Sequence, residues 1–247
     1  MNSQTTIIIR GQWRSRQETS AAAGARLSAM LSAIGMVSPH LTEWYRKTSR
    51  RPSREPVVPS TSTPESAERF ILSGARPNEP EAGFSVSAWN GELQQASANF
   101  SLTIGAHDGK HAAFNRVQVV LSDATGLRSL SSFTVVRDVA KAVVSTMEPS
   151  SLDVTTRRWM LSGPPGSEFT CPAGGWMSYV EGSQSFELPA GIETEPLVSG
   201  LLLIATKADF SDSDPSHVDA GYRLNEVLGD IRKIENDLTP GPVRALG

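Results

Sequence analysis

The sequence predicts an α+β fold made of two similar β-α-β-β halves, with mostly antiparallel sheets and helices packed on them. Segments with β-branched residues or alternating apolar residues recur along the chain, which is the pattern of strands. Longer segments place apolar residues three and four positions apart, which is the pattern of amphipathic helices. This order of segments, with tryptophans after the helices, occurs twice and indicates a repeated unit.

The first half is predicted to span residues 1–110. Residues 5–13 are rich in β-branched side chains and are expected to form a strand. A helix is expected over 21–36, ended by Gly35 and Pro39, with one further helical turn at 41–46. Alternating residues predict strands at 84–89 and 99–104, joined by a hairpin turn at Asn90-Gly91, because both residues tolerate positive φ.

A basic, proline-rich segment interrupts the first half at 48–64. Proline lacks the N–H that helices and ladders use, so this segment is predicted to be an extended loop. Its arginines are not interleaved with aromatic residues, as binding of single-stranded nucleic acid favours. We therefore expect no direct contact with nucleic acid.

The second half is predicted to span 111–238. It contains expected strands at 117–121, 175–180 and 197–206 and helices at 129–147 and 216–234. Asp214 and Pro215 are suited to the N-cap and first position of the last helix. Residues 239–247 contain two prolines and two glycines and are expected to be a flexible tail.

Composition favours a globular protein of the cytoplasm. Of 247 residues, 38% are hydrophobic and 20% are charged. The longest apolar run, about 201–205, is far shorter than the ~20 residues of a membrane helix, and no secretory signal is evident. The single cysteine, Cys171, cannot form an internal disulfide. We expect no association with membranes, and the oligomeric state stays open.

Charge is distributed unevenly along the chain. Residues 1–80 hold 11 basic and 6 acidic side chains, whereas residues 171–247 hold 5 and 12. An acidic region can steer a basic partner, or it can simply keep a surface solvated. The first alternative predicts four acidic partner contacts, which are Glu193, Glu195, Asp209 and Asp212.

The sequence predicts no catalytic residue, no cofactor and no metal site. His107 and His111 are spaced as metal ligands on a helix would be, but Gly109 between them disfavours a helix. Cys171 has no histidine near it in the sequence. A small enzyme using Cys171 or a histidine-bound metal stays open as an alternative, because a fold can bring distant residues together.

Several aromatic-centred segments carry a resemblance to a known family. They are residues 27–45, with Pro39, Leu41, Trp44 and Tyr45 after a helix; Ala88-Trp89-Asn90-Gly91; Leu152-Asp153; Gly175-Trp176-Met177-Ser178-Tyr179; and 201–205 followed by Asp209-Phe210, His217-Val218 and Ala220. With them the chain resembles the immunity protein 52 family over most of its length, apart from the proline-rich loop and the tail.

The resemblance implies a small α+β protein that protects a bacterium from a toxin delivered by type VI secretion. It further implies a toxin that is a nuclease with a restriction-endonuclease-like domain, neutralised by covering its active or substrate-binding surface. The family has no active site to carry over, and Trp44, Trp89, Trp176 and Tyr179 are expected to be structural aromatics. An effector chaperone or adaptor that does not inhibit is the alternative function.

Overall fold

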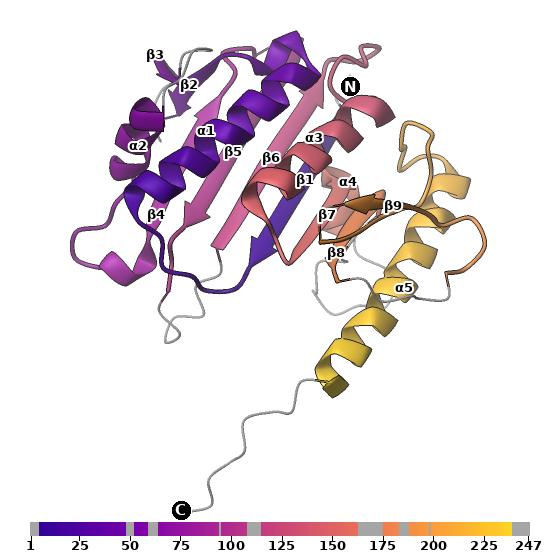
Figure 1. Cartoon of the computed structure of the whole chain (residues 1–247). Helices are drawn as coiled ribbons and strands as arrows, with labels where there is room; N and C mark the ends of the chain where they lie inside the picture. The colour runs from indigo at the N-terminus through magenta and orange to yellow at the C-terminus, as the bar shows by residue number, and fades with distance from the viewer. Residues whose placement is uncertain are drawn as a thin grey trace, which may run out of the picture.

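The computed structural model describes residues 5–47, 52–58, 64–93, 95–107, 115–162, 175–182, 188–197 and 199–238. Ten strands within these residues form one sheet, in the order β3-β2-β4-β5-β6-β1-β7-β8-β10-β9 (Figure 1). Every pair of neighbouring strands is antiparallel. The strands are β1 (Thr5–Trp13), β2 (Trp44–Lys47), β3 (Pro52–Val58), β4 (Phe84–Trp89), β5 (Ala96–Ile104), β6 (Asn115–Asp123), β7 (Ser151–Thr156), β8 (Met177–Glu181), β9 (Glu193–Leu197) and β10 (Gly200–Ile204). The α+β class is confirmed.

Three helices cover one face of the sheet. They are α1 (Ser20–Val37), α2 (Pro64–Leu72) and α3 (Phe133–Met147) (Figure 1). The strands alternate buried and partly exposed residues, so β5 and β6 each direct one row of side chains, such as Phe100 and Val119, into this main core. Leu27, Met30 and Ile34 of α1 are fully buried in the same core, as their spacing predicted.

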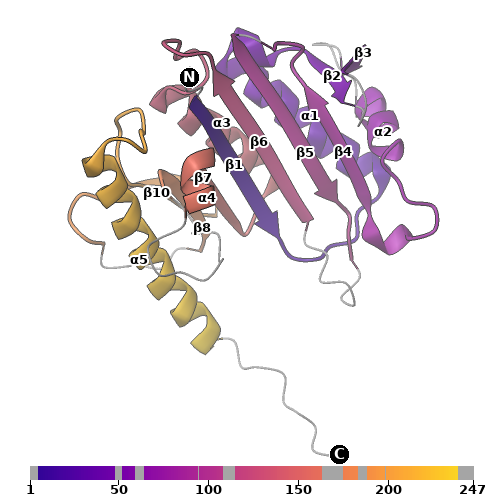
Figure 2. The ribbon, with the colours of Figure 1, turned by 180° about the vertical axis from the view of Figure 1, so that it is seen from behind.

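The last helix builds a second core on the opposite face. Helix α5 (Pro215–Leu238) packs Leu224, Val227 and Leu228 against Val180 of β8 and Leu203 of β10. Figure 2 shows α5 in front of this end of the sheet, with the short helix α4 (Arg157–Ser162) beside β1. Asp214 accepts a hydrogen bond from the Ser216 N–H at 2.9 Å, which is the N-cap contact that the sequence predicted.

The strand orders of the two halves differ, so the predicted repeat is not seen. After α1 the chain runs to the far end of the sheet at β2 and returns inward through β4 and β5. After α3 it enters β7, next to β1, and then moves outward through β8 and β10. The first strands of the two halves, β1 and β6, also pair with each other at the centre of one continuous sheet. The repeated order of elements along the chain therefore does not produce a repeated topology.

The prediction of a loop across 48–64 is wrong for Pro52–Val58, which form the edge strand β3. Prolines are compatible with this position because an edge strand needs ladder hydrogen bonds on one side only, and the pairing with β2 is irregular. The expected helical turn at 41–46 is also wrong. Residues Pro39–Leu41 form one turn of 3-10 helix, and Trp44 begins strand β2.

Asn90 and Gly91 do not form the predicted two-residue hairpin. Strand β4 ends at Trp89 and β5 begins at Ala96, so the connection is longer. Gly91 has positive φ, as expected, but the side chain of Asn90 is buried and organises the connection. Its amide donates to the carbonyls of His40 at 3.0 Å and Ala96 at 2.7 Å. These bonds fix the end of the β4–β5 pair to the turn that precedes β2.

Helix α1 is long and apolar enough to cross a membrane when judged by length and composition alone. Core helices of soluble proteins and signal sequences meet the same criteria, so this is weak evidence for a membrane helix. In this structure α1 packs between α2 and α3. A Cβ on Gly24 would lie 2.7 Å from the Glu68 backbone of α2, which shows how closely these two helices approach.

Candidate partner-binding surface

The four acidic residues predicted to contact a partner lie on two segments. Glu193 and Glu195 are on the edge strand β9, and Asp209 and Asp212 are on the connection between β10 and α5. Each of these carboxylates already has a partner within the chain. The contacts and exposure of each carboxylate determine whether it is accessible to an external partner.

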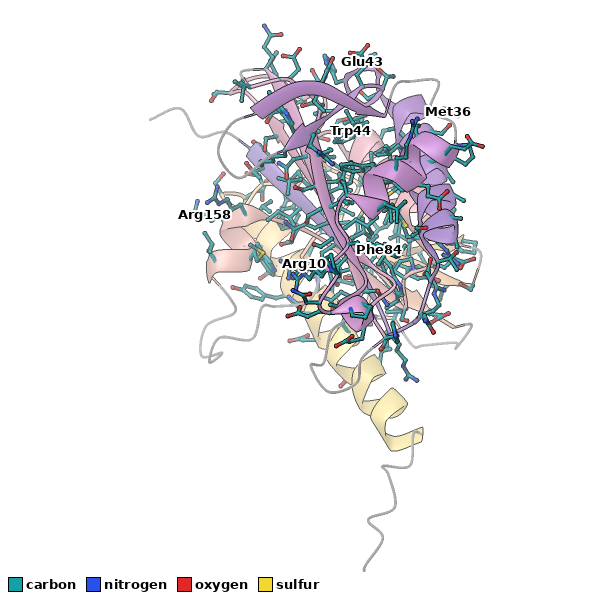
Figure 3. The ribbon with its side chains drawn as sticks, turned by 90° about the vertical axis from the view of Figure 1, so that its left-hand side faces the viewer. Arg10, Met36, Glu43, Trp44, Phe84 and Arg158 are labelled. Atoms are coloured by element: carbon teal, nitrogen blue, oxygen red, sulfur yellow. The ribbon has the colours of Figure 1, made fainter. Side chains whose placement is uncertain are left out.

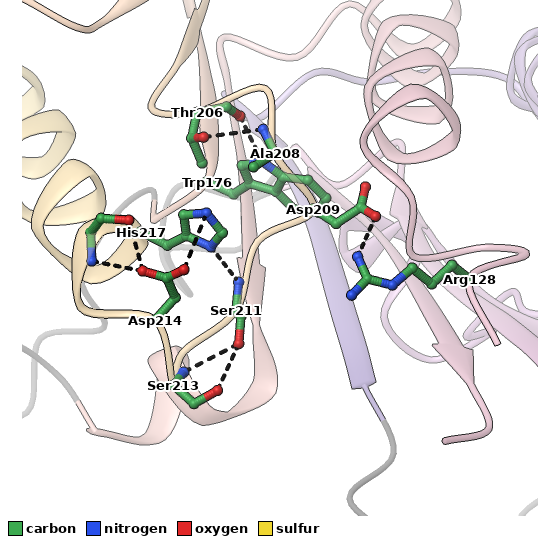
Figure 4. Close-up of polar contacts among 10 residues, drawn as sticks. Arg128, Trp176, Thr206, Ala208, Asp209, Ser211, Ser213, Asp214 and His217 are labelled. Atoms are coloured by element: carbon green, nitrogen blue, oxygen red, sulfur yellow. Dashed lines mark hydrogen bonds and ion pairs between the residues drawn. The ribbon is translucent and has the colours of Figure 1, made fainter. Parts of the chain in front are cut away.

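Asp209 caps a helix that is distant in sequence. Its Oδ1 accepts the Phe133 N–H at 2.7 Å, at the first position of α3, where Ser132 makes no side-chain cap hydrogen bond. Its Oδ2 pairs with the exposed guanidinium of Arg128 (Figure 4). The four N-terminal N–H groups of a helix lack partners inside the helix and favour negative charge. Asp209 therefore joins the β10–α5 connection to α3.

Asp212 holds the end of β7. Both of its oxygens accept from the Thr156 hydroxyl, at 2.6 and 2.7 Å, and the same hydroxyl accepts the Trp159 N–H of α4 at 3.1 Å. Thr156 is buried, so an unpaired hydroxyl there would be costly. This chain of bonds fixes α4 to the connection that leads into α5.

The two β9 carboxylates form ion pairs of different exposure. Glu195 lies 3.0 Å from Lys141 Nζ and 3.7 Å from Arg137 Nη1, both on α3, and its side chain is 26% exposed. Glu193 lies 2.5 Å from Lys207 Nζ, and its side chain is 53% exposed. Glu193 is thus the most accessible of the four predicted contacts, although contact with a partner stays a prediction for all of them.

A separate polar cluster begins α5. The Ser211 N–H donates to His217 Nδ1 at 3.1 Å (Figure 4). The His217 ring stacks on Phe210. Hydrogen bonds from the hydroxyl and backbone N–H of Ser216 lower the pKa of the Asp214 carboxyl. His217 is therefore held by packing and hydrogen bonding at the start of the helix.

The four aromatic residues singled out in the sequence are buried. Trp44 donates from Nε1 to the Leu41 carbonyl at 3.0 Å and packs edge-on against Phe100. Trp176 is fully buried and donates to the Thr206 carbonyl at 3.0 Å. Tyr179 bonds Ser199 at 2.9 Å, and burial raises the pKa of the Tyr179 phenol. Trp89 is 9% exposed and lies on the opposite face of the sheet from Trp44.

The residues of the enzymatic alternative fall partly outside the described part of the chain. Cys171 and His111 lie in ranges that the structure does not describe. His107 is exposed, and its Nδ1 lies 3.1 Å from the Gly105 carbonyl. Among the described residues, no group of three or more histidine, cysteine or acidic side chains is arranged to hold a metal ion.

One surface that was not predicted from the sequence is the open sheet face, defined as the side of β4, β5, β6 and β1 that points away from α1 and α3. Figure 2 shows no helix in front of β4, β5 and β6. Figure 3, viewed from the β3 end, places Arg10 and Arg158 on this side and Met36 on the helical side. The side chains directed outward on these four strands include no carboxylate. They are Ser85, Ser87 and Trp89; Ser97, Asn99, Ser101 and Thr103; Arg116, Gln118, Val120 and Ser122; and Thr6, Ile8, Arg10 and Gln12. Trp89, Ser122 and Ile8 are buried, so the accessible part of the face lies at the end that carries Arg116.

The alternation of apolar and polar residues in these strands is the sequence signal that could have predicted this face. Strands that alternate apolar residues with serine, threonine, asparagine and glutamine bury one side and leave the other to solvent. The position of α5 could not be foreseen. It covers β8 and β10 and leaves β4, β5 and β6 uncovered on the same side.

The fold therefore belongs to a class of α+β proteins built on one antiparallel sheet whose second face is covered only in part. The sequence matches the model of the family "Immunity protein 52" over residues 6–235, and the chain belongs to that family. It is thus a member of a family of immunity proteins.

One solved structure with a similar fold is the Pseudomonas aeruginosa T6SS protein PA0821. It matches with a TM-score of 0.51 and 11% sequence identity, over 92% of this chain and 76% of that chain. At this identity the similarity concerns the fold alone. No curated protein matches the chain.

Proposed function

We propose that this protein binds and neutralises a cognate toxin delivered by type VI secretion, and that the toxin is a nuclease whose active or substrate-binding surface it covers. Membership of the immunity protein 52 family over residues 6–235 carries the proposal. The similar fold of PA0821, a T6SS protein, supports the link to this secretion system.

The proposal that the toxin is a nuclease is supported by charge. A nuclease needs a positively charged groove for the phosphates of its substrate. Carboxylates that remain exposed on this chain, such as Glu181, Asp219 and Glu226, suit such a groove and would raise the rate of association. Because a nuclease acts on nucleic acid inside the cell, we place the protective complex in the cytoplasm.

Expression of the toxin encoded beside this gene, with and without this protein, tests the proposal. We expect growth arrest without the protein, growth with it, and loss of nucleic-acid cleavage when the purified proteins are mixed. Binding without rescue of growth would favour the chaperone or adaptor alternative. Toxicity without damage to nucleic acid would be compatible with the immunity function but would show that the toxin is not a nuclease.

We further propose that protection is stoichiometric rather than catalytic. The purified protein should block its toxin only up to an equimolar ratio, and the toxin should be recovered intact. Replacement of Cys171 with Ser, or of His107 and His111 with Ala, should leave protection unchanged. Loss of protection by a folded variant would restore the enzymatic alternative.

A further inference from the structure

We propose that the open sheet face binds the toxin through a carboxylate-bearing patch of the toxin domain, with Arg116 as the main anchor. The inference rests on the proposed function and adds the contact surface and its chemistry. It differs from the acidic contacts predicted from the sequence, because the charges of this face are positive.

The ladder registers place Arg116 in the middle of a polar row. It lies opposite Thr103 of β5 and opposite Gln12 of β1. Ser85 of β4 continues the row beyond Thr103. Arg116 is exposed, while its neighbour Thr103 is partly buried. The long Arg116 side chain is thus surrounded by shorter hydroxyl and amide side chains. A partner can therefore reach its guanidinium.

A second row, parallel to the first, contains Ser87, Ser101, Gln118 and Arg10 in register. Arg10 has local partners, since its Nη2 lies 3.2 Å from Met160 Sδ and it is opposite Asp153 of β7. Asp153 also accepts from the Ser178 hydroxyl at 2.8 Å. Nearby negative charge therefore offsets part of the charge of Arg10, whereas neither strand neighbour of Arg116 is acidic.

Tyr45, which is partly exposed and packs on the buried Trp89, adds a feature typical of binding surfaces. The rings of Tyr45 and Trp89 lie 6.5 Å apart on this side of the sheet, and the Tyr45 hydroxyl donates to Glu43 at 2.7 Å. Tyrosine, tryptophan and arginine are the residues enriched among binding hot spots. Serine and asparagine beside them supply adaptable hydrogen bonds.

Charge decides the chemistry of the partner. The outward positions of β4, β5, β6 and β1 carry two arginines and no carboxylate. An arginine binds a carboxylate through two parallel hydrogen bonds, which gives both strength and direction. A single nucleic-acid strand fits the face less well, because the whole chain has a net charge of −3 and Trp89 is too buried to stack on bases.

The test measures binding of the catalytically inactivated toxin domain to the full chain and two face variants, Arg116→Glu and Ser101→Glu. Each variant places a carboxylate on the open face, and each is expected to weaken binding at least about tenfold. Arg69→Glu is the matched control, since Arg69 is an exposed arginine of α2 on the helical side. It should change affinity less than about twofold. Thermal unfolding of all three variants checks that they fold.

Wild-type affinity for both face variants would overturn this inference and leave the proposed function in place. Absence of binding by the wild-type chain would overturn the proposed function itself. Binding of a single-stranded oligonucleotide by the wild-type chain, lost in Arg116→Glu while toxin binding persists, would assign the face to nucleic acid and also contradict the inference.

Discussion

Replacement of Asp209 distinguishes a structural role of its carboxylate from a role in contacting a partner. In Asp209→Ala the Phe133 N–H of α3 loses its acceptor, and Arg128 loses its ion pair. Loss of an N-cap side chain costs about 0.5–2 kcal/mol. The ion pair adds at most about 1 kcal/mol, because the side chains are 67% and 30% exposed. We therefore expect a loss of about 1–2 kcal/mol in the free energy of unfolding, and a Tm lower by roughly 3–6 °C.

Asp209→Asn refines the experiment, since the amide oxygen can still accept the Phe133 N–H while the charge is removed. It should retain most of the stability. Asp219→Ala is the control, because Asp219 is an exposed acid of α5 and its removal should change stability by less than about 0.5 kcal/mol. Urea and thermal unfolding give the comparison. If Asp209→Ala were as stable as Asp219→Ala, the capping role would be refuted. If Asp209→Asn were stable but bound the toxin more slowly, Asp209 would be a contact after all.

Three further predictions address packing, ionisation and charge. Gly24→Ala should destabilise by about 1–2 kcal/mol in chemical unfolding, because its Cβ would meet the Glu68 backbone at 2.7 Å, whereas Gly35→Ala in the same helix should be neutral or stabilising. The pKa of the Tyr179 phenol is raised above its ordinary 10.0, so its contribution to stability is present below pH 10 and is lost as the pH rises through the raised pKa. Phenolate absorbance during a pH titration, compared with Tyr179→Phe, measures this. Glu193→Lys should slow association with a basic toxin and weaken its salt dependence, and unchanged stopped-flow rates would argue against a contact there.

Sequence patterns located elements best where one local signal sufficed. The predicted strands 5–13 and 84–89 match β1 and β4 at both ends, because alternating or β-branched residues meet a clear break in pattern. Helix α3 begins at Phe133, later than the predicted 129. The reason is Asp123, which accepts the N–H groups of Leu130 and Ser131 and holds the preceding residues in a non-helical turn. That contact joins residues several positions apart and leaves no periodic signal.

Predictions that depended on the arrangement of elements were less successful. The strand expected at 197–206 is β10 (Gly200–Ile204), whereas its hairpin partner β9 (Glu193–Leu197) was not predicted. The core that β10 shares with α5 is visible only in three dimensions. The repeat of β-α-β-β units failed because the order of segments does not determine which strands become neighbours. Strands that follow similar helices, β2 and β7, lie in different places: β2 is next to the edge strand β3, and β7 is next to the central strand β1.

The charge of a stretch of sequence is a poor guide to the charge of a surface. Residues 171–247 carry seven more acidic than basic side chains, yet Asp209 and Glu195 pair with Arg128 and Lys141, which lie earlier in the chain. Folding moves these basic groups onto the acidic segment and reduces the charge that a partner meets. In a sheet, the outward positions of paired strands form one surface whatever their distance in sequence. Thr103, Arg116 and Gln12 come from three separate segments and lie side by side. Strand register therefore determines which charges share a surface, and charge along the chain does not.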